Sequence, residues 1–317
     1  MALDLSALTN YVEENAQQLT AAAIFSAKTA SLIEAKGNVQ VGIKSAETIN
    51  VLTTDAVFQA GGTCGFSSSG TTTITQRQIT VGKIKVQEAI CPKTFEAKYT
   101  QKALRVGSTY DYMAYATDFT NQKVQRIGAA LETAIWQGDT ASGTANLNKF
   151  MGFATIINAL GFGGSGDPIN GNTSALTTLT KSNVRQAVDE IFQAIPAALL
   201  DKDDFVIFCG NDTFREYVVA LRDANLYHYT VDAANMEIVV AGTNIKLIGV
   251  NGLNGTDYMV GICMSNMYLG TDMLNEQDKF ELFYAKEADE MRFVVEFKLG
   301  CQVAFTDEVV FWKKASA

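Results

Sequence analysis

The chain has 317 residues, 47% of them apolar and 19% charged, so it is long enough to bury cores in about two domains and is not disordered in composition. A formal net charge of −9 and a pI of about 4.8 exclude a protein that coats nucleic acid through a broad basic surface. There is no long apolar run and no basic flank at the N-terminus, so we expect no membrane span, no signal peptide and a soluble protein made inside the cell.

The first residues predict a peripheral arm. Residues 4–34 show a loose helical period with many Ala, Gln and Thr residues and few strong core formers. Strand-like residues 43–60 follow. A second strand-like stretch, residues 79–90, changes its alternation phase at Gly82-Lys83, which indicates a β-bulge.

The segment between these two strands has an unusual composition. Residues 61–78 are rich in Gly, Ser and Thr and hold only Phe66 and Ile74 as sizeable apolar residues, so the segment cannot bury itself. We therefore expect a two-stranded projection in which residues 43–60 pair with residues 79–90 across a mobile tip. An isolated hairpin is marginal in water, so the projection should rest on another molecule. A flexible surface loop is the alternative.

The strongest helical pattern covers residues 111–137, where apolar residues recur at three- and four-residue steps before Gly138. A continuous helix of this length would span roughly 40 Å. We expect Lys123, Gln125, Arg126 and Glu132 on its wetter faces.

The rest of the chain predicts a mixed module and then mostly strands. Helices are expected at residues 182–195 and 213–224, on either side of a buried strand at residues 205–209. From residue 237 the pattern is mostly β, and apolar residues alternate from Met291 to Phe305 in a strand of roughly 50 Å. This order indicates an α+β protein of elongated shape.

Five stretches carry a resemblance to a known family. They are ITVGKIKVQEAICPKTFEAKYT (Ile79–Thr100), ALETAIWQGD (Ala130–Asp139), FMGFATIINA (Phe150–Ala159), DFVIFCGNDTFREYVVAL (Asp204–Leu221) and FVVEFKLGCQVAFTDEVVFW (Phe293–Trp312). In the order of its predicted elements and in the local character of these stretches, the chain resembles the major capsid protein of tailed bacteriophages with the Hong Kong 97-type fold. The resemblance covers nearly the whole chain but contains no invariant catalytic motif.

The resemblance implies an α+β fold with an N-terminal arm, an extended β-hairpin loop, a long spine helix, and peripheral and axial domains. The expected divisions are residues 1–42 for the arm, 43–100 for the extended loop with its flanking strands, 101–160 for the spine helix and peripheral domain, 161–274 for the axial domain, and 275–317 for the long peripheral strands and C-terminus.

The resemblance also implies a function and partners. The chain would assemble with itself into hexamers and pentamers of an icosahedral shell that encloses double-stranded DNA without sequence-specific binding. Phe66, Ile74 and Arg77 would make intersubunit contacts. A scaffolding protein, a portal protein and decoration or minor capsid proteins are expected partners, and no membrane is expected. The location implied is the virion capsid, assembled in the host cell cytoplasm.

The sequence offers little for chemistry, and we expect no catalytic residue, cofactor or metal. Residues 161–166 match G-x-G-x-x-G, but Pro168 and Gly171 follow instead of an amphipathic helix, which favours a flexible loop. His228 is the single histidine and cannot build a multi-histidine metal site. Asp201, Asp203 and Asp204 favour a solvated turn over a cation site.

The cysteines and tryptophans also favour structural roles. The five cysteines stand singly, with no C-x-x-C pair; Cys209 and Cys301 should be buried and Cys64 exposed. Trp136 and Trp312 should anchor the core or an interface. Lys83 or Lys85 could join an intersubunit isopeptide bond as in some relatives, but edge protection of a strand is the preferred interpretation.

Three alternatives to a viral capsid subunit stay open. One is an encapsulin-like nanocompartment shell of the same fold, which would enclose cargo enzyme in place of DNA. A phage tail protein would form tubes or trimers, and an enzyme that uses only carboxylates, such as Asp201 and Asp204, would show activity that depends on pH.

Overall fold

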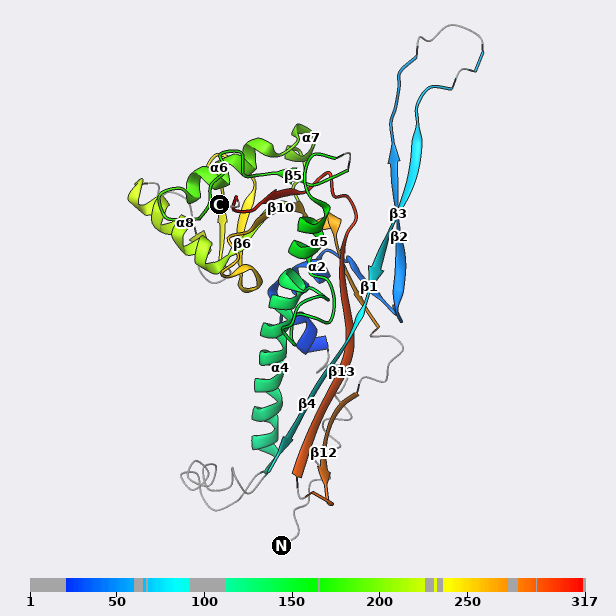
Figure 1. Ribbon diagram of the computed structural model, residues 1–317, viewed down its shortest axis with the longest axis vertical. Helices are drawn as coiled ribbons and strands as arrows, with labels where there is room; N and C mark the ends of the chain where they lie inside the picture. The colour runs from blue at the N-terminus through cyan, green and yellow to red at the C-terminus, as the bar shows by residue number, and fades with distance from the viewer. Residues whose placement is uncertain are drawn as a thin grey trace.

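The computed structural model describes residues 21–59, 65–66, 68–91, 112–164, 166–225, 231–232, 236–272, 279–288 and 290–315. The molecule is elongated, with a hairpin projecting from a body of long strands and a long helix, and a mixed helix and sheet module on the opposite side (Figure 1). The predicted arm residues 4–20, all of residues 92–100, Cys64 and His228 lie outside the described residues.

The body is built around one long strand, β13 (Glu290–Val303). β13 pairs antiparallel with β4 (Gly82–Ile90), β12 (Lys279–Ala285) and β11 (Met267–Thr271), and β1 (Val39–Val41) pairs parallel with β11. Its 14 residues would extend about 48 Å, and Met291, Phe293, Val295 and Phe297 are buried at alternate positions. The predicted long strand with one buried face is confirmed.

A long helix, α4 (Tyr112–Gln137), lies alongside these strands (Figure 1). Its 26 residues span about 39 Å and end directly before Gly138, as predicted. Phe119 of α4 contacts Phe293 of β13 edge to face, with ring centroids 5.8 Å apart. The following helix, α5 (Phe153–Leu160), packs against α4, and the rings of Trp136 and Phe153 lie 5.7 Å apart.

The N-terminal helix α2 (Lys28–Ala35) is joined to α4 by a buried polar network. The Glu132 carboxylate accepts hydrogen bonds from the Thr29 backbone N–H at 2.9 Å and the Thr29 hydroxyl at 2.6 Å. The Trp136 indole N–H donates to the same hydroxyl at 2.7 Å. No side chain caps α2 from the preceding residue, Ala27, so Glu132 of another helix satisfies a backbone donor in its first turn.

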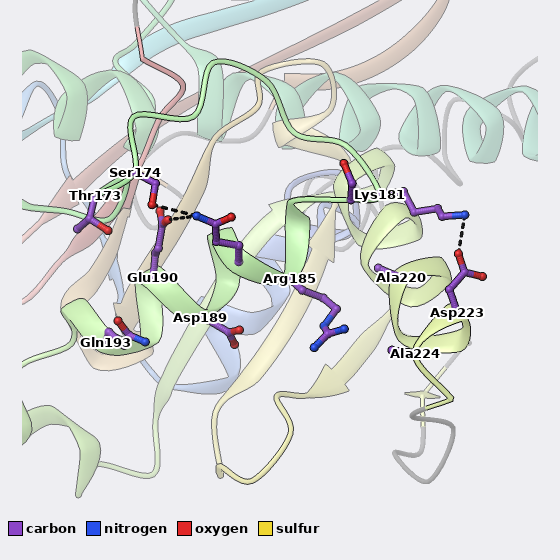
Figure 2. Close-up of a pocket in the computed structure, with 12 residues that line it drawn as sticks. Thr173, Ser174, Lys181, Arg185, Asp189, Glu190, Gln193, Ala220, Asp223 and Ala224 are labelled. Atoms are coloured by element: carbon purple, nitrogen blue, oxygen red, sulfur yellow. Dashed lines mark hydrogen bonds and ion pairs between the residues drawn. The ribbon is translucent and has the colours of Figure 1, made fainter.

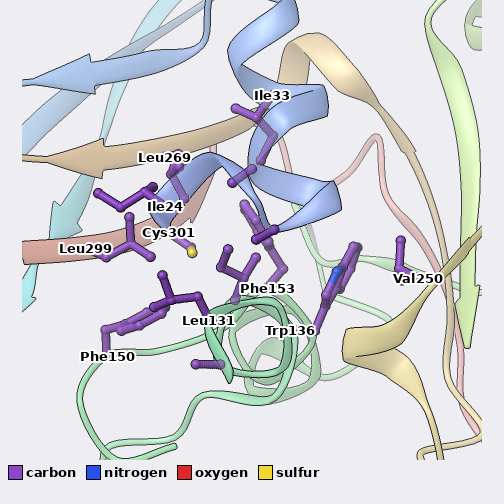
Figure 3. Packing of buried hydrophobic residues seen from close by; sticks show 14 of the residues in the cluster. Ile24, Ile33, Leu131, Trp136, Phe150, Phe153, Val250, Leu269, Leu299 and Cys301 are labelled. Atoms are coloured by element: carbon purple, nitrogen blue, oxygen red, sulfur yellow. The ribbon is translucent and has the colours of Figure 1, made fainter. Parts of the chain in front are cut away.

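Glu132 was predicted on a wetter face of α4, and that prediction is wrong. Its exposed fraction is 3%, because Thr29 supplies the hydrogen bonds that a buried carboxylate requires. Burial raises the pKa of Glu132, while the two hydrogen bonds from Thr29 act to lower it. Around this network, apolar side chains of α2, α4, α5 and β13 meet in one core (Figure 3).

A second module is formed by a seven-stranded sheet. Its order is β5 (Ile169–Asn170), β14 (Val310–Trp312), β10 (Met259–Cys263), β6 (Phe205–Gly210), β9 (Lys246–Val250), β8 (Glu237–Val239) and β7 (Val231–Asp232). Short 3₁₀ turns occupy Asn251–Leu253 and Met264–Asn266. β6 is buried at all six positions, as its continuous apolar sequence predicted.

Helices α6 (Val184–Ala194), α7 (Ala197–Leu200) and α8 (Asn211–Asp223) accompany this sheet (Figure 1). α6 packs against α8 and β14, while α8 packs against β6 and β9. The predicted helices at residues 182–195 and 213–224 are confirmed, with small shifts of their ends.

The projecting hairpin pairs differently from the prediction. β2 (Ala46–Thr54) pairs antiparallel with β3 (Thr72–Thr80), from Ala46 opposite Thr80 to Thr54 opposite Thr72. Residues 82–90 form β4, which belongs to the sheet of β13. The predicted pairing of residues 43–60 with 79–90 is therefore wrong, and the phase change at Gly82-Lys83 marks a change from one sheet to another where a bulge was expected. The predicted mobile tip lies partly outside the described residues, which omit 60–64 and 67.

Replacing Thr29 with Val tests the network that joins α2 to α4. The substitution keeps the shape but removes the hydroxyl, so the Trp136 N–H and one Glu132 oxygen lose their partner. We expect the free energy of unfolding, measured by urea titration of the unassembled chain, to fall by about 1–3 kcal/mol. The matched control is Thr133→Val at a partly exposed threonine of α4 whose hydroxyl donates to the Ala129 carbonyl of its own helix, which should change it by less than about 0.5 kcal/mol. Equal effects of the two substitutions would contradict a special role for Thr29.

Replacing Gly82 with Ala tests the close approach between the first residue of β4 and the backbone of Lys149. A Cβ at Gly82 would lie 1.8 Å from the Lys149 carbonyl oxygen, so backbone must move to accept it. We expect a loss of about 1–3 kcal/mol in the free energy of unfolding. Gly143→Ala is the control, since nothing lies within 4 Å of a Cβ there. An unchanged free energy of unfolding for Gly82→Ala would show that the two backbone segments move apart at no cost in stability.

Candidate intersubunit surfaces

The two faces of the β2–β3 hairpin differ at its base. Residues directly opposite each other in an antiparallel pair share a face, so Leu52 and Ile74 lie together, as do Asn50 and Gln76. This face is exposed; Leu52 and Ile74 have exposed fractions of 56% and 67%. Side-chain hydrogen bonds between Gln76 and Asn50 (3.0 Å) and between Thr54 and Thr72 (3.1 Å) hold the strands together there.

The opposite face of the hairpin base packs on the body. A small apolar core forms there from Ile43, Ile49, Val51, Ile79, Val81 and Ala304. The Arg77 guanidinium donates a hydrogen bond to the Thr306 hydroxyl at 2.7 Å, and that hydroxyl donates to the Gly166 carbonyl at 2.5 Å. The base of the hairpin is therefore fixed to the molecule, while its outer half projects (Figure 1).

The three predicted contact residues lie in different surroundings. Phe66 and Ile74 are exposed, Phe66 to 96%. Arg77 is partly buried, and its guanidinium is engaged with Thr306 of its own chain. Intersubunit contact remains a prediction for all three residues.

Further exposed apolar residues were missed. Leu52, Val57 and Phe58 are exposed, Phe58 to 99%. The sequence pattern predicted residues 43–60 as a strand paired with residues 79–90, and that pairing does not place Leu52 opposite Ile74 as the structure does. We call Leu52, Val57, Phe58, Phe66 and Ile74 the apolar hairpin surface. Large apolar side chains gathered on a projection are typical of a surface that binds another protein.

A groove with an apolar floor runs between α4 and β4, and we call it the α4–β4 groove. Its volume is about 400 Å³. Its apolar lining consists of Ile84, Val86, Ile127, Ala130, Leu131, Ala134, Ala145 and Phe297, and four cations, Lys85, Lys123, Arg126 and Lys149, line it as well. Lys85 pairs with Glu296 at 3.0 Å, and Lys123 pairs with Glu88. Within the described part of the chain, Arg126 and Lys149 form no ion pair.

A larger groove of about 830 Å³ lies between α6 and α8, and its lining is almost entirely polar (Figure 2). Gln186 donates hydrogen bonds to Ser174 at 2.9 Å and to the buried Glu190 carboxylate at 3.0 Å. Lys181 pairs with Asp223 at 2.5 Å, which raises the pKa of Lys181. This groove offers no large apolar surface to a partner.

Comparisons with known proteins show which solved structures share this fold. No family model and no curated protein matches the chain. Among solved structures, it superposes on a chain of the satellite phage P4 procapsid that includes the size determination protein Sid (TM-score 0.58, 12% identity, 95% of this chain and 91% of that chain). It also superposes on the capsid of an empty GTA particle (TM-score 0.58, 12% identity, 90% of each chain). The capsid of Myoviridae phage XM1 gives a TM-score of 0.52 at 12% identity, over 89% of this chain and 92% of that chain. The chain has the phage capsid protein fold. The predicted α+β fold of the Hong Kong 97 type is thus confirmed.

The segments that suggested chemistry have structural roles in this capsid fold. Gly161, Gly163 and Gly166 have positive φ angles of 77°, 99° and 85°, and the next element along the described chain is the short strand β5, so the loop does not lead into a helix as the dinucleotide-binding motif requires. Burial opposes ionisation of Asp204, but hydrogen bonds from Ser265 outweigh it and lower its pKa. Asp204 therefore serves to hold the turn at Ser265.

The buried cysteines and tryptophans also belong to the framework. Cys209 and Cys301 are buried as predicted, and so is Cys263, whose pKa burial raises to about 12, which leaves its thiol protonated and unreactive. Trp136 and Trp312 are fully buried, which confirms their predicted anchoring role.

Among the described residues, no group of three or more His, Cys, Asp or Glu side chains could hold a metal ion. None of the described helices is long and apolar enough to cross a bilayer.

Proposed function

We propose that the chain is a major capsid protein, a structural and non-enzymatic subunit that assembles with itself into an icosahedral shell around double-stranded DNA. The observation that carries the proposal is the likeness in fold to several capsid proteins over about nine tenths of both chains. The fixed base and exposed apolar surface of the hairpin support it, because such a projection gains stability only by resting on another molecule.

The domain divisions of a capsid protein are part of the proposal. In it, residues 1–42 form the arm, 43–100 the extended loop and flanking strands, 101–160 the spine helix and peripheral domain, 161–274 the axial domain and 275–317 the peripheral strands. Several strands pair across these divisions: β1, β4 and β11 lie in the sheet of β13, and β14 lies in the seven-stranded sheet.

The partners proposed follow from the same function. Copies of the chain would form hexamers and pentamers by contacts between two different patches, the arrangement that closes into rings. A scaffolding protein, a portal protein and decoration or minor capsid proteins complete the proposal, with assembly in the host cytoplasm and a final place in the virion capsid. With a net charge of −9, the shell would enclose DNA without a broad attraction for its phosphates.

Electron microscopy of the purified chain, alone and together with a scaffolding protein, tests this function. We expect closed shells, capsomers or long tubular heads, because intersubunit contacts are built into the fold. A chain that stays monomeric under every condition, or that forms only tail-like tubes, would overturn the proposal. Closed shells that enclose a cargo enzyme and no DNA would identify a nanocompartment instead.

Paired serine substitutions test the exposed hairpin. Phe66→Ser with Ile74→Ser should leave the free energy of unfolding within about 0.5 kcal/mol, because both residues are exposed, yet should sharply reduce the yield of shells on a sizing column. Thr53→Ser with Thr73→Ser, a directly opposed pair on the other face of the hairpin, is the control and should assemble normally. Normal yield from the Phe66 and Ile74 variant would rule out both residues as assembly contacts.

A further inference from the structure

The buried side chain of Glu132 lies where three parts of the molecule meet. Its carboxylate, on α4, accepts hydrogen bonds from Thr29 of α2. The preceding residue of α2, Lys28, donates a hydrogen bond from its ammonium group to the Gly249 carbonyl of β9 at 3.0 Å. In the 3₁₀ turn after β9, a Cβ on Gly252 would lie 2.3 Å from the backbone carbonyl oxygen of Glu132. The N-terminal helix, the long helix and the seven-stranded module therefore contact one another around Glu132.

The helix α2 depends on this contact for its position. It has eight residues, and an isolated helix this short is not stable in water. Three of its residues are buried, Thr29, Ala30 and Ile33, and Ile33 belongs to the core that also contains Trp136 (Figure 3). A segment held by so few buried side chains opens more readily than the centre of a core. The docking of α2 is thus sensitive to a change in the free energy of its contact with Glu132.

The surroundings of Glu132 favour its neutral form. Its exposed fraction is 3%, and the donors around it, from Thr29 and Trp136, are neutral groups that satisfy oxygens without cancelling a charge. Moving an ionised carboxylate out of water costs more free energy than moving a neutral carboxyl. Burial raises the pKa of Glu132, and this effect outweighs the opposing effects of Thr29, Trp136 and Lys28.

The other titratable groups beside Glu132 leave this preference in place. Lys28 of α2 favours the ionised form, but its effect is smaller than that of burial. Cys301 of β13 is buried, and burial raises the pKa of its thiol, which is therefore neutral and adds no charge. The residues of β9, of the following 3₁₀ turn and of α8 that lie nearby are Gly249, Asn251 and Asn211, which are uncharged.

A cleft gives protons a route to the carboxyl. It has a volume of about 420 Å³, and its lining includes Lys28, Gln125, Asn251 and Glu132 itself. Glu132 can therefore exchange a proton with solvent while the chain stays folded.

We propose that Glu132 is a proton-dependent latch for α2, which is held against α4 while the carboxyl is neutral and loosens when the carboxyl ionises. The 2.6 Å contact between the oxygens of Glu132 and Thr29 can be kept in both states, because either the hydroxyl or a protonated carboxyl can donate the proton. The difference between the states is the cost of a negative charge in the core. The inference goes beyond the proposed function and does not rest on it.

The docking of α2 should weaken as the pH rises. A carboxyl whose pKa is raised in the docked state binds its proton more tightly there than when α2 is open. The extra stability is complete below the ordinary glutamate pKa and is lost as the pH rises to the raised pKa. Across this window the equilibrium constant for opening α2 should increase by up to about tenfold per pH unit, and it should stay constant at higher pH.

Hydrogen exchange of the purified, unassembled chain tests the latch. Protection factors, which remove the intrinsic pH dependence of exchange, would be measured for the Leu32 and Ile33 amides from about pH 4.5 to about pH 8, with the amides of β6 as reference. We expect the protection of α2 to decrease with pH in the parent chain. Glu132→Gln, which keeps the hydrogen-bonding capacity of a neutral carboxyl, should abolish the decrease. Glu34→Gln, at an exposed glutamate of α2, is the matched control and should behave like the parent.

Two results would overturn the inference. One is a parent profile that is flat or rises with pH, and the other is an equal decrease in the parent and in Glu132→Gln. Shells that form from a chain without this pH dependence would leave the proposed function standing and remove only the latch.

A second variant keeps the test decisive if Glu132→Gln does not fold. Lys28 acts to lower the pKa of Glu132, so Lys28→Met should move the end of the decrease to a higher pH. Loss of the hydrogen bond to Gly249 would by itself lower protection equally at every pH. Lys36→Met, at an exposed lysine directly after α2, should leave the profile where it is. An unshifted profile in Lys28→Met would contradict the latch.

Discussion

The long strand β13 is the element on which the rest of the molecule depends. β4 and β12 pair with the same stretch of β13, which therefore lies between them, and β11 pairs with its other end. The buried side chains of β13 support α4, and Ala304, directly after its end, packs against the hairpin base. Because one strand carries contacts to the helix, the sheet and the hairpin, displacement at one end of β13 would reach all three.

The sequence predicted the elements of this framework best where one face is buried. β13 and α4 each have one apolar face, and their alternation and helical period are strong for that reason. The hairpin return strand β3 was missed because both faces are exposed over its outer half, so its residues show no apolar period, only the high β-propensity of Thr and Ile. The regular alternation of β4 reflects burial against the long helix and β13, which local pattern could not distinguish from hairpin pairing.

The candidate surfaces could be predicted only in part, for a related reason. Phe66 and Ile74 stood out as large apolar residues in a segment without other apolar side chains. The α4–β4 groove could not be found in this way, since its lining comes from β4, α4, β13 and residues 145–149, which are far apart in sequence. Glu132 was misjudged for the same reason: its partner Thr29 lies 103 residues away, and a charge on a helix is normally solvated unless such a partner exists.

The hairpin combines a fixed base with glycines of positive φ further out, and both would matter in the proposed shell of pentamers and hexamers. In such a shell, neighbouring copies would meet at different angles around five-fold and six-fold axes, so a contact between identical chains would have to tolerate a change in geometry. Gly65 and Gly70 have φ angles of 134° and 116°, which other residues rarely adopt and glycine reaches at little cost. The apolar core around Ile79 and the Arg77–Thr306 hydrogen bond keep the direction of the projection constant. Intersubunit contacts through apolar side chains such as Phe66, if the proposed function holds, would have little directional preference and would persist when the angle between neighbours changes, whereas a hydrogen-bonded tip would favour a single geometry.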